Sequence, residues 1–134
     1  MIATTQDQSQ RLLRCGVSAD TADMIETRLG NLLNRTQDFP VDETKETLVW
    51  SLSALLGLLP KEIDIDGYPY RISIYFENPD EPVIGNQWCL YYRPKKHTEK
   101  SRIDDVPMYA HDLIECAVLI IEWLTDNGYK LNEQ

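Results

Sequence analysis

The sequence predicts an α+β protein with short N-terminal helices, a three-stranded antiparallel meander and a C-terminal helix packed on the sheet. Two changes in the spacing of apolar residues along the chain support this prediction. Apolar residues recur three and four apart within residues 1–60 and again over 109–127, whereas they alternate over 68–76. Because helical runs and strand runs are segregated along the chain, an alternating βαβ architecture is disfavoured.

The chain length and the net charge limit which classes of protein fit the sequence. The 134 residues match one domain, with a helical part at about 1–60 and the sheet plus last helix at about 61–134. Thirteen Lys and Arg against 22 Asp and Glu give a net charge of −9. Since duplex DNA is held mainly by cations on its phosphates, this charge argues against a duplex-DNA binder.

The first helix is indicated at both of its ends. Thr5 followed by Gln8 is a capping-box pattern, which starts a helix. We expect this helix to end near Cys15, where Gly16 can take the left-handed conformation.

A second helix is expected over 18–34, and residues 35–47 are expected to form a polar surface connection. The apolar positions of this helix fall three and four apart, so that they share one stripe. These positions are Ala22, Ile25, Leu29, Leu32 and Leu33. Gly30 interrupts the stripe, so the helix either stops there or continues weakened.

The segment 50–60 is the most apolar part of the first half and predicts a third helix. Ser51 suits its N-cap, and Pro60 ends it because proline lacks the N–H that a helix needs. With apolar residues nearly all round, this helix should be buried on more than one side.

Three strands follow. The first is expected at 62–65, and Asp66-Gly67 is a strong signal for a type I′ hairpin turn, since both residues need positive φ. The second strand covers 68–77, where alternating residues should place one face on the core, and 78–86 should form a loop. The third covers 87–93, and its two apolar faces predict that it is the middle or a doubly covered strand.

The clearest helix lies at about 109–127. Its apolar face is wide and its polar residues form only a strip, so it should cover the sheet. Asn127-Gly128 is a stop signal.

One segment is similar to a DNA-binding motif. Residues 12–25 place Gly-Val-Ser between two expected helices, which resembles the turn of a helix-turn-helix. The second helix would present Asp20, Asp23 and Glu26 to the DNA phosphates, which repel them. Two capped helices that meet at a glycine explain the pattern equally well.

The chain has no GxSxG, P-loop or GxGxxG motif. His111 and Glu115 are four apart and would share a helix face, which is compatible with two metal ligands, but no third ligand has a matching spacing. We therefore expect no enzymatic activity, no cofactor and no metal. An enzyme would need a deep pocket in which His111, Glu115 or Asp64 converge.

One cationic run lies at 93–102. Its partner-contact candidates are Arg93, Lys95, Lys96, Lys100 and Arg102. The run is either a contact for an acidic partner or RNA, or a solvated connection whose lysines discourage edge pairing.

Three aromatic residues are further candidates for partner contact. Tyr75 and Tyr91 fall on strand faces opposite the main core set, and Trp123 interrupts the polar strip of the last helix. They either anchor a protein contact or pack beneath the long loops. Exposed together, they would form a surface for a partner or for self-association, including a weak homodimer.

Cys15, Cys89 and Cys116 are an odd number at wide spacing, which predicts buried thiols in a reducing cytoplasm rather than disulfides. The polar N-terminal segment lacks the pattern of a signal peptide. The longest apolar run, 116–121, is far shorter than the roughly twenty residues of a membrane span. We expect a cytoplasmic protein with no membrane contact.

Three stretches resemble a family of small proteins of unknown function from prophage-like and mobile-element regions of gut bacteria. They are 1–24 (MIATTQDQSQRLLRCGVSADTADM), 50–63 (WSLSALLGLLPKEI) and 114–133 (IECAVLIIEWLTDNGYKLNE). The resemblance implies a small accessory protein of a mobile element. It implies no activity, cofactor or functional residue.

The leading hypothesis is a non-catalytic accessory protein that binds another protein. The alternative is a nucleic-acid-linked role, in which either the run 93–102 contacts RNA or the acidic surface imitates DNA and occupies a DNA-binding protein. An enzyme is the third class.

Overall fold

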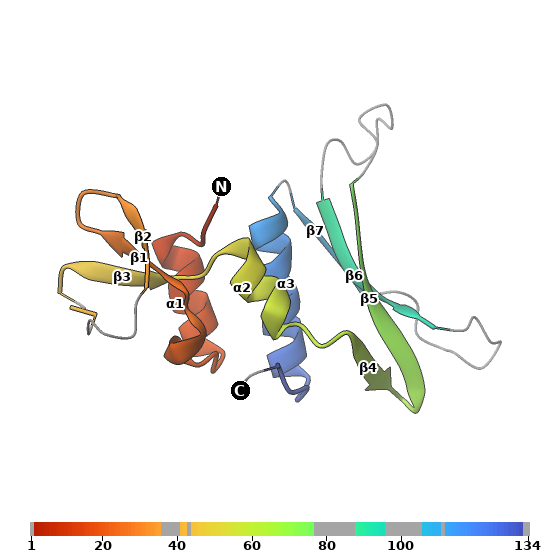
Figure 1. Ribbon diagram of the computed structural model, residues 1–134. Helices are drawn as coiled ribbons and strands as arrows, with labels where there is room; N and C mark the ends of the chain where they lie inside the picture. Colours follow the sequence, from red (N-terminus) through yellow and green to blue (C-terminus); the bar gives the residue numbers. More distant parts are fainter. Residues whose placement is uncertain are drawn as a thin grey trace.

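The computed structural model describes residues 2–35, 41–42, 44–76, 88–95, 106–110 and 112–132. These residues form three α-helices, one 3₁₀ turn and seven strands in two antiparallel sheets. Figure 1 shows the helices between the two sheets, with α1 beside the three-stranded sheet and α3 beside the four-stranded one. The fold belongs to the predicted α+β class.

Helix α1 (Gln6–Arg14) has the predicted capping box. The Thr5 hydroxyl accepts from the Gln8 N–H at 3.1 Å, and the Gln8 side-chain oxygen accepts from the Thr5 N–H at 2.9 Å. Gly16, at the other end, has a φ of +97°. Both ends of the helix are therefore confirmed.

The predicted helix over 18–34 is wrong. The chain forms a 3₁₀ turn, η1 (Ala19–Thr21), followed by the antiparallel strands β1 (Met24–Thr27) and β2 (Leu32–Asn34). Gly30, with a φ of +86°, lies in the turn between the two strands.

The apolar spacing within 18–34 suits a helix, but these residues form strands. They do so because β1 pairs with a strand further along the chain, which the local spacing does not reveal. β3 (Glu46–Val49) pairs with β1, and the sheet order is β2-β1-β3. Ser18 caps only the short turn η1. The expected connection over 35–47 is also partly wrong, because its last two residues belong to β3.

Trp50 ties three segments of the N-terminal half together, and it is fully buried. Its N–H donates to the Thr4 hydroxyl at 3.0 Å, and its carbonyl accepts from the Thr4 N–H at 2.9 Å. Its indole Nε1–H donates to the Thr21 hydroxyl at 2.9 Å. The first residues, η1 and the end of β3 thus meet at one residue, through both its backbone and its side chain.

Helix α2 (Leu52–Leu58) begins at Ser51, whose hydroxyl accepts from the Ala54 N–H at 3.1 Å, as predicted. Leu55 and Leu58 are fully buried. The helix packs on α3.

The second sheet contains β4 (Glu62–Ile65), β5 (Tyr68–Phe76), β6 (Trp88–Pro94) and β7 (Val106–Ala110), in that order. Asp66 and Gly67 have φ values of +52° and +86°, as the predicted turn requires. β6 lies between β5 and β7, which confirms it as a middle strand.

The fourth strand corrects the expected three-stranded meander and the expected start of the last helix. Residues 106–110 pair with β6 as an edge strand, a position that tolerates Pro107. Helix α3 (Leu113–Asp126) starts later, where the Asp112 carboxylate accepts from the Ile114 N–H at 2.9 Å.

Helix α3 packs on β6 and β7 on one side and on α1 and α2 on the other. Half of its fourteen residues are buried. These are Ile114, Cys116, Ala117, Val118, Ile120, Ile121 and Leu124. None of the described helices has the length and apolarity to cross a membrane.

Arg11 joins α1 to two turns of α3. Its guanidinium contacts the Glu115 carboxylate at 2.8 Å and the Glu122 carboxylate at 2.5 Å. The Gln8 amide donates to the second oxygen of Glu115 at 2.6 Å. Because these charge-assisted bonds favour the charged form, they raise the pKa of Arg11, against the effect of its burial.

Replacing either of two fully buried side chains should destabilise the protein. Trp50→Ala and Ile121→Ala should each lower the free energy of unfolding by about 2–5 kcal/mol, because each empties a packed position. Urea denaturation measures the loss. Leu29→Ala, at an 88% exposed position, should stay within about 0.5 kcal/mol of wild type. Equal effects at the buried and exposed sites would contradict this packing.

Removing the guanidinium that joins α1 to α3 should also destabilise the fold. We expect Arg11→Ala to lower the free energy of unfolding by about 1–2 kcal/mol, since two carboxylates lose their shared cation. Arg14→Ala, at an exposed position of the same helix, serves as the control. The loss should shrink when Glu122→Gln is already present; an unchanged loss would show that the ion pair does not contribute.

Candidate functional site

Among the described residues, helices cover one face of the four-stranded sheet and leave the other face without a helix (Figure 1). Tyr70, Leu90 and Tyr92 point toward α3 and are almost fully buried. Because side chains alternate along a strand, the residues between them point the other way. We call this opposite surface the free face. On β5 and β6 it comprises Arg71, Ser73, Tyr75, Cys89, Tyr91 and Arg93.

The aromatic end of the free face contains two of the predicted partner contacts. Tyr75 and Tyr91 lie edge to face, with ring centroids 5.4 Å apart and ring planes at 84°. Tyr75 is 39% exposed and Tyr91 is half-buried. Cys89 faces the same side beside Tyr75 and is buried. The two rings therefore lie together on one face of the sheet.

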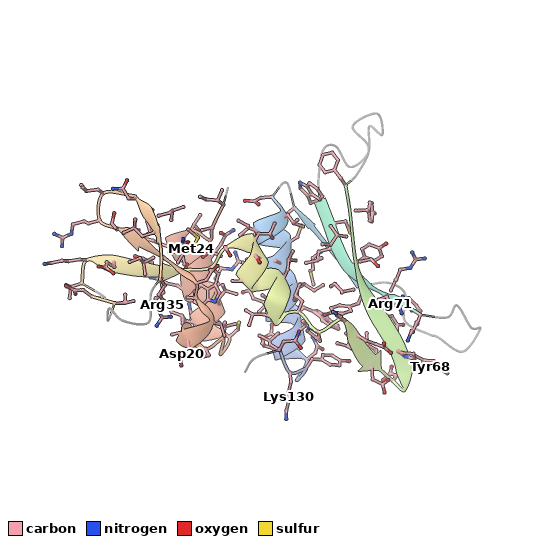
Figure 2. The ribbon with its side chains drawn as sticks, in the orientation of Figure 1. Asp20, Met24, Arg35, Tyr68, Arg71 and Lys130 are labelled. Atoms are coloured by element: carbon pink, nitrogen blue, oxygen red, sulfur yellow. The ribbon has the colours of Figure 1, made fainter. Side chains whose placement is uncertain are left out.

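The other end of the free face is cationic. Arg71 and Arg93 are direct cross-strand partners, and both are exposed. Neither guanidinium forms an ion pair within the described residues. Glu62, opposite Arg71 on β4, instead contacts Lys95 at 3.3 Å. Figure 2 labels Arg71 on the side of the sheet away from the helices.

Two like charges directly opposite each other destabilise an antiparallel pair. The fold keeps this pair on a chain whose net charge is −9. A bound carboxylate would remove the repulsion, because a guanidinium binds a carboxylate through two parallel hydrogen bonds. The cationic end is therefore suited to an acidic ligand.

Trp123, another predicted contact, does not belong to this surface. Trp123 lies on α3, half-buried, and stacks on Tyr129 with centroids 5.6 Å apart. Lys96, Lys100 and Arg102 lie outside the described residues. Arg71 was not predicted as a site residue, although the alternation over 68–76 placed it on the same face as Tyr75.

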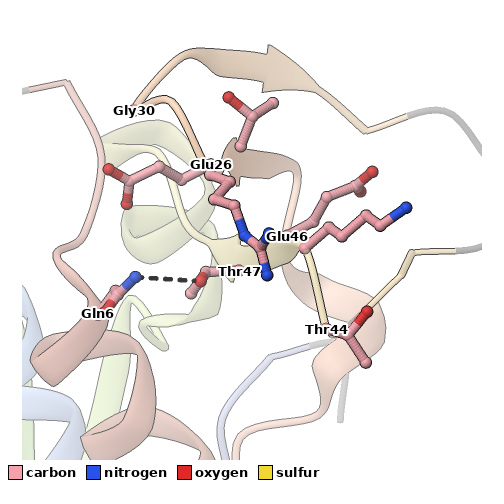
Figure 3. Close-up of a pocket in the computed structure, with 9 residues that line it drawn as sticks. Gln6, Glu26, Gly30, Thr44, Glu46 and Thr47 are labelled. Atoms are coloured by element: carbon pink, nitrogen blue, oxygen red, sulfur yellow. Dashed lines mark hydrogen bonds between the residues drawn. The ribbon is translucent and has the colours of Figure 1, made fainter.

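A polar hollow of about 270 Å³ lies beside the three-stranded sheet (Figure 3). Glu26 and Glu46 line it together with Arg28 and Lys45, so that it holds charges of both signs. The Gln6 amide donates to the Thr47 hydroxyl across it at 3.4 Å. Among the described residues no three His, Cys, Asp or Glu side chains are grouped to hold a metal ion.

The helix-turn-helix interpretation is contradicted. After the turn at Gly16 the chain forms η1 and the strand β1, so no second helix is present to enter a DNA groove. The carboxylate of Glu115 is held by Arg11 and Gln8, whereas Asp64 is exposed on β4. His111 lies outside the described residues.

The three thiols differ in exposure. Cys89 and Cys116 are buried, as predicted, and Cys15 is half-buried. The Cys116 thiol donates to the Trp88 carbonyl at 3.3 Å. Burial raises the pKa of Cys116 to about 11, because the thiolate would lose its hydration. Cys116 is therefore a structural thiol at neutral pH.

Comparison of the chain with family models, with curated proteins and with solved structures gives no match. We therefore infer function from the geometry and chemistry of the free face.

The raised pKa of Cys116 predicts a loss of stability in alkali. The folded thiol has a pKa of about 11, whereas the ordinary value is 9.0, so the unfolded chain releases this proton first. The free energy of unfolding should fall as the pH rises from about 9 to about 11. Denaturation series should show a shallower fall for Cys116→Ala; an identical pH dependence would contradict the assignment.

Proposed function

We propose that this chain is a non-catalytic binding module whose free face takes an acidic segment of another protein. Arg71 and Arg93 carry this proposal, because they lie opposite each other on an acidic chain and form no ion pair within the described residues. They supply paired donors for carboxylates, and the neighbouring tyrosines supply apolar area.

The tyrosines give the surface a specific shape. Tyrosine and arginine are the residue types enriched where protein contacts draw most of their affinity. The ring pair of Tyr75 and Tyr91 orders two such side chains before binding, so less side-chain freedom remains to be lost. An acidic segment with an apolar residue beside its carboxylates fits both ends of the free face.

Charge favours a protein partner over a nucleic acid. The free face also carries negative charge, because the carboxylates of Glu62 and Asp64 are exposed on the same side of β4. A phosphate backbone running across the strands would meet them as well as the arginines, whereas a folded acidic protein can present its carboxylates locally. Contact with RNA through the free face is therefore the weaker candidate.

The biological setting is part of the proposal. We infer a cytoplasmic accessory protein of a mobile element. The likeness of 1–24, 50–63 and 114–133 to the family described above supports the mobile element. The buried thiols, which are not joined in a disulfide, support a reducing compartment.

Charge reversal on the free face tests the proposal. The double variant Arg71→Glu, Arg93→Glu is compared with Arg14→Glu, Arg28→Glu, which changes the net charge equally at exposed positions elsewhere. Cross-linking in the native host followed by quantitative mass spectrometry identifies proteins held by wild type. A genuine partner should be retained by the control and reduced roughly tenfold or more by the free-face variant.

Equal recovery with both double variants would show that the free face is not the contact. Fluorescence anisotropy with a labelled single-stranded oligoribonucleotide examines the other class. Tight binding of that RNA, lost on reversal of Arg71 and Arg93 and weakened by salt, would assign the face to RNA and overturn the proposal.

A further inference from the structure

Helix α3 ends in a cap that is built on Asn127 and Gly128. Gly128 has a φ of +79°, and its N–H donates to the Thr125 carbonyl at 3.2 Å. The Tyr129 N–H reaches back to the Leu124 carbonyl at 2.9 Å. These two bonds, with glycine in the left-handed conformation, form the Schellman motif that ends many helices.

The side chain of Asn127 belongs to the same cap. Its Nδ2 amide donates to the Trp123 carbonyl at 2.8 Å, which already accepts from the Asn127 backbone N–H at 3.1 Å. The Trp123 ring stacks on Tyr129, with ring planes at 17°. Asn127 itself is exposed, so water reaches its side chain.

The cap is followed by a segment, 129–132, that is bonded to helix α2. The Asn132 N–H donates to the Leu58 carbonyl at 2.9 Å. Its side-chain amide donates to the carbonyls of Gly57 and Leu59, at 3.2 and 3.0 Å. Because the last carbonyls of a helix lack partners within it, this segment completes the C-terminal end of α2. The cap of α3 sets where the segment begins.

Asn127 and Gly128 are also a reactive pair. Among the asparagines of the chain, only Asn127 precedes a glycine. Since glycine has no Cβ, its backbone nitrogen can approach the side-chain carbonyl carbon, Cγ, of the residue before it. The nitrogen loses its proton and bonds to Cγ, the Cγ–Nδ2 bond breaks, and Nδ2 leaves with that proton as ammonia. Water then opens the cyclic imide to aspartate or isoaspartate.

The folded cap opposes this reaction. The attacking nitrogen belongs to Gly128, and its proton is bonded to the Thr125 carbonyl. The leaving group belongs to Asn127, and it donates to the Trp123 carbonyl. Both bonds must break before the nitrogen can reach Cγ. The reaction therefore requires local opening of the cap.

We propose that Asn127 is a site of spontaneous deamidation, gated by opening of the α3 cap, and that its products loosen segment 129–132 from α2. Either product is a carboxylate, which cannot donate to the Trp123 carbonyl. Its negative charge is also unfavourable at the C-terminal end of a helix. Isoaspartate in addition routes the backbone through the side chain and lengthens it by one carbon, so the bonds of Gly128 and Tyr129 cannot both be kept.

This inference goes beyond the proposed function and does not rest on it. The cap lies at the end of α3, whereas the proposed contact lies on the free face of the sheet. Failure of the deamidation experiments would leave the charge-reversal test of Arg71 and Arg93 unaffected, and the reverse also holds.

Ageing of wild type in mildly alkaline buffer tests the site and its gate. Peptide mapping by liquid chromatography and mass spectrometry follows aspartate and isoaspartate at each asparagine, in native protein and in guanidinium chloride. In the unfolded chain Asn127 should convert fastest, and Asn34, which precedes Arg35, is the internal control. In the native protein conversion of Asn127 should be at least about tenfold slower, yet measurable.

Three results of the ageing experiment would overturn the proposal. Conversion of another asparagine ahead of Asn127 in the unfolded chain would remove the site. Equal rates at Asn127 in native and unfolded protein would remove the gate. A native Asn127 that stays intact long after the unfolded chain has converted would show that the cap does not open locally.

The Asn127→Asp variant tests the consequence, with Asn34→Asp as a control of equal charge at an exposed position of β2. Residue-resolved hydrogen exchange follows the Tyr129 amide in the cap and the Asn132 amide on α2. In Asn127→Asp both should exchange roughly two- to fivefold faster than in wild type, and the control should leave them unchanged. The isoaspartate form, separated from the aged sample, should exchange faster still. Unchanged exchange in both modified forms would overturn the loosening of segment 129–132.

Discussion

The burial of α3 between the four-stranded sheet and the other helices is the constraint on which the rest of the structure depends. Seven apolar side chains of this helix leave water. Each of the Ile, Leu and Val side chains among them stabilises the fold by roughly 1.5–3 kcal/mol before entropy is counted. Arg11 of α1 adds ion pairs to Glu115 and Glu122 of α3. The four-stranded sheet and the N-terminal half are thus both packed against α3.

The position of α3 decides which surfaces remain for binding. Because α3 covers only one side of the sheet, Arg71 and Arg93 stay exposed on the other side, although Cys89 on that same side is buried. Because β4 is four residues long and β5 is nine, the far end of β5 extends beyond β4. The free face thus follows from the packing of α3, whereas the uncovered end of β5, among the described residues, follows from the lengths of the two strands.

Much of the fold is readable in the residues, because local chemistry specifies it. Thr5 with Gln8, Ser51, and Asp66-Gly67 each satisfy backbone groups or dihedral angles within a few residues, and each acts as predicted. The strands β1–β3 were not predicted, because their partners lie across turns and an apolar spacing of three and four suits a helix equally well. For the same reason, pairing with β6 could not be foreseen for 106–110. The free face was half predicted: alternation identified Tyr75 and Tyr91, but only the register reveals that Arg71 faces Arg93.

Residue-resolved hydrogen exchange under increasing denaturant tests the central role of α3 most directly. If α3 holds the molecule together, the amides of Ile120 and Ile121 should open only by global unfolding, with an opening free energy equal to that from denaturation. The hairpin of β1 and β2 should open more easily. Amides of α3 that exchange as fast as that hairpin, with little dependence on denaturant, would contradict the account.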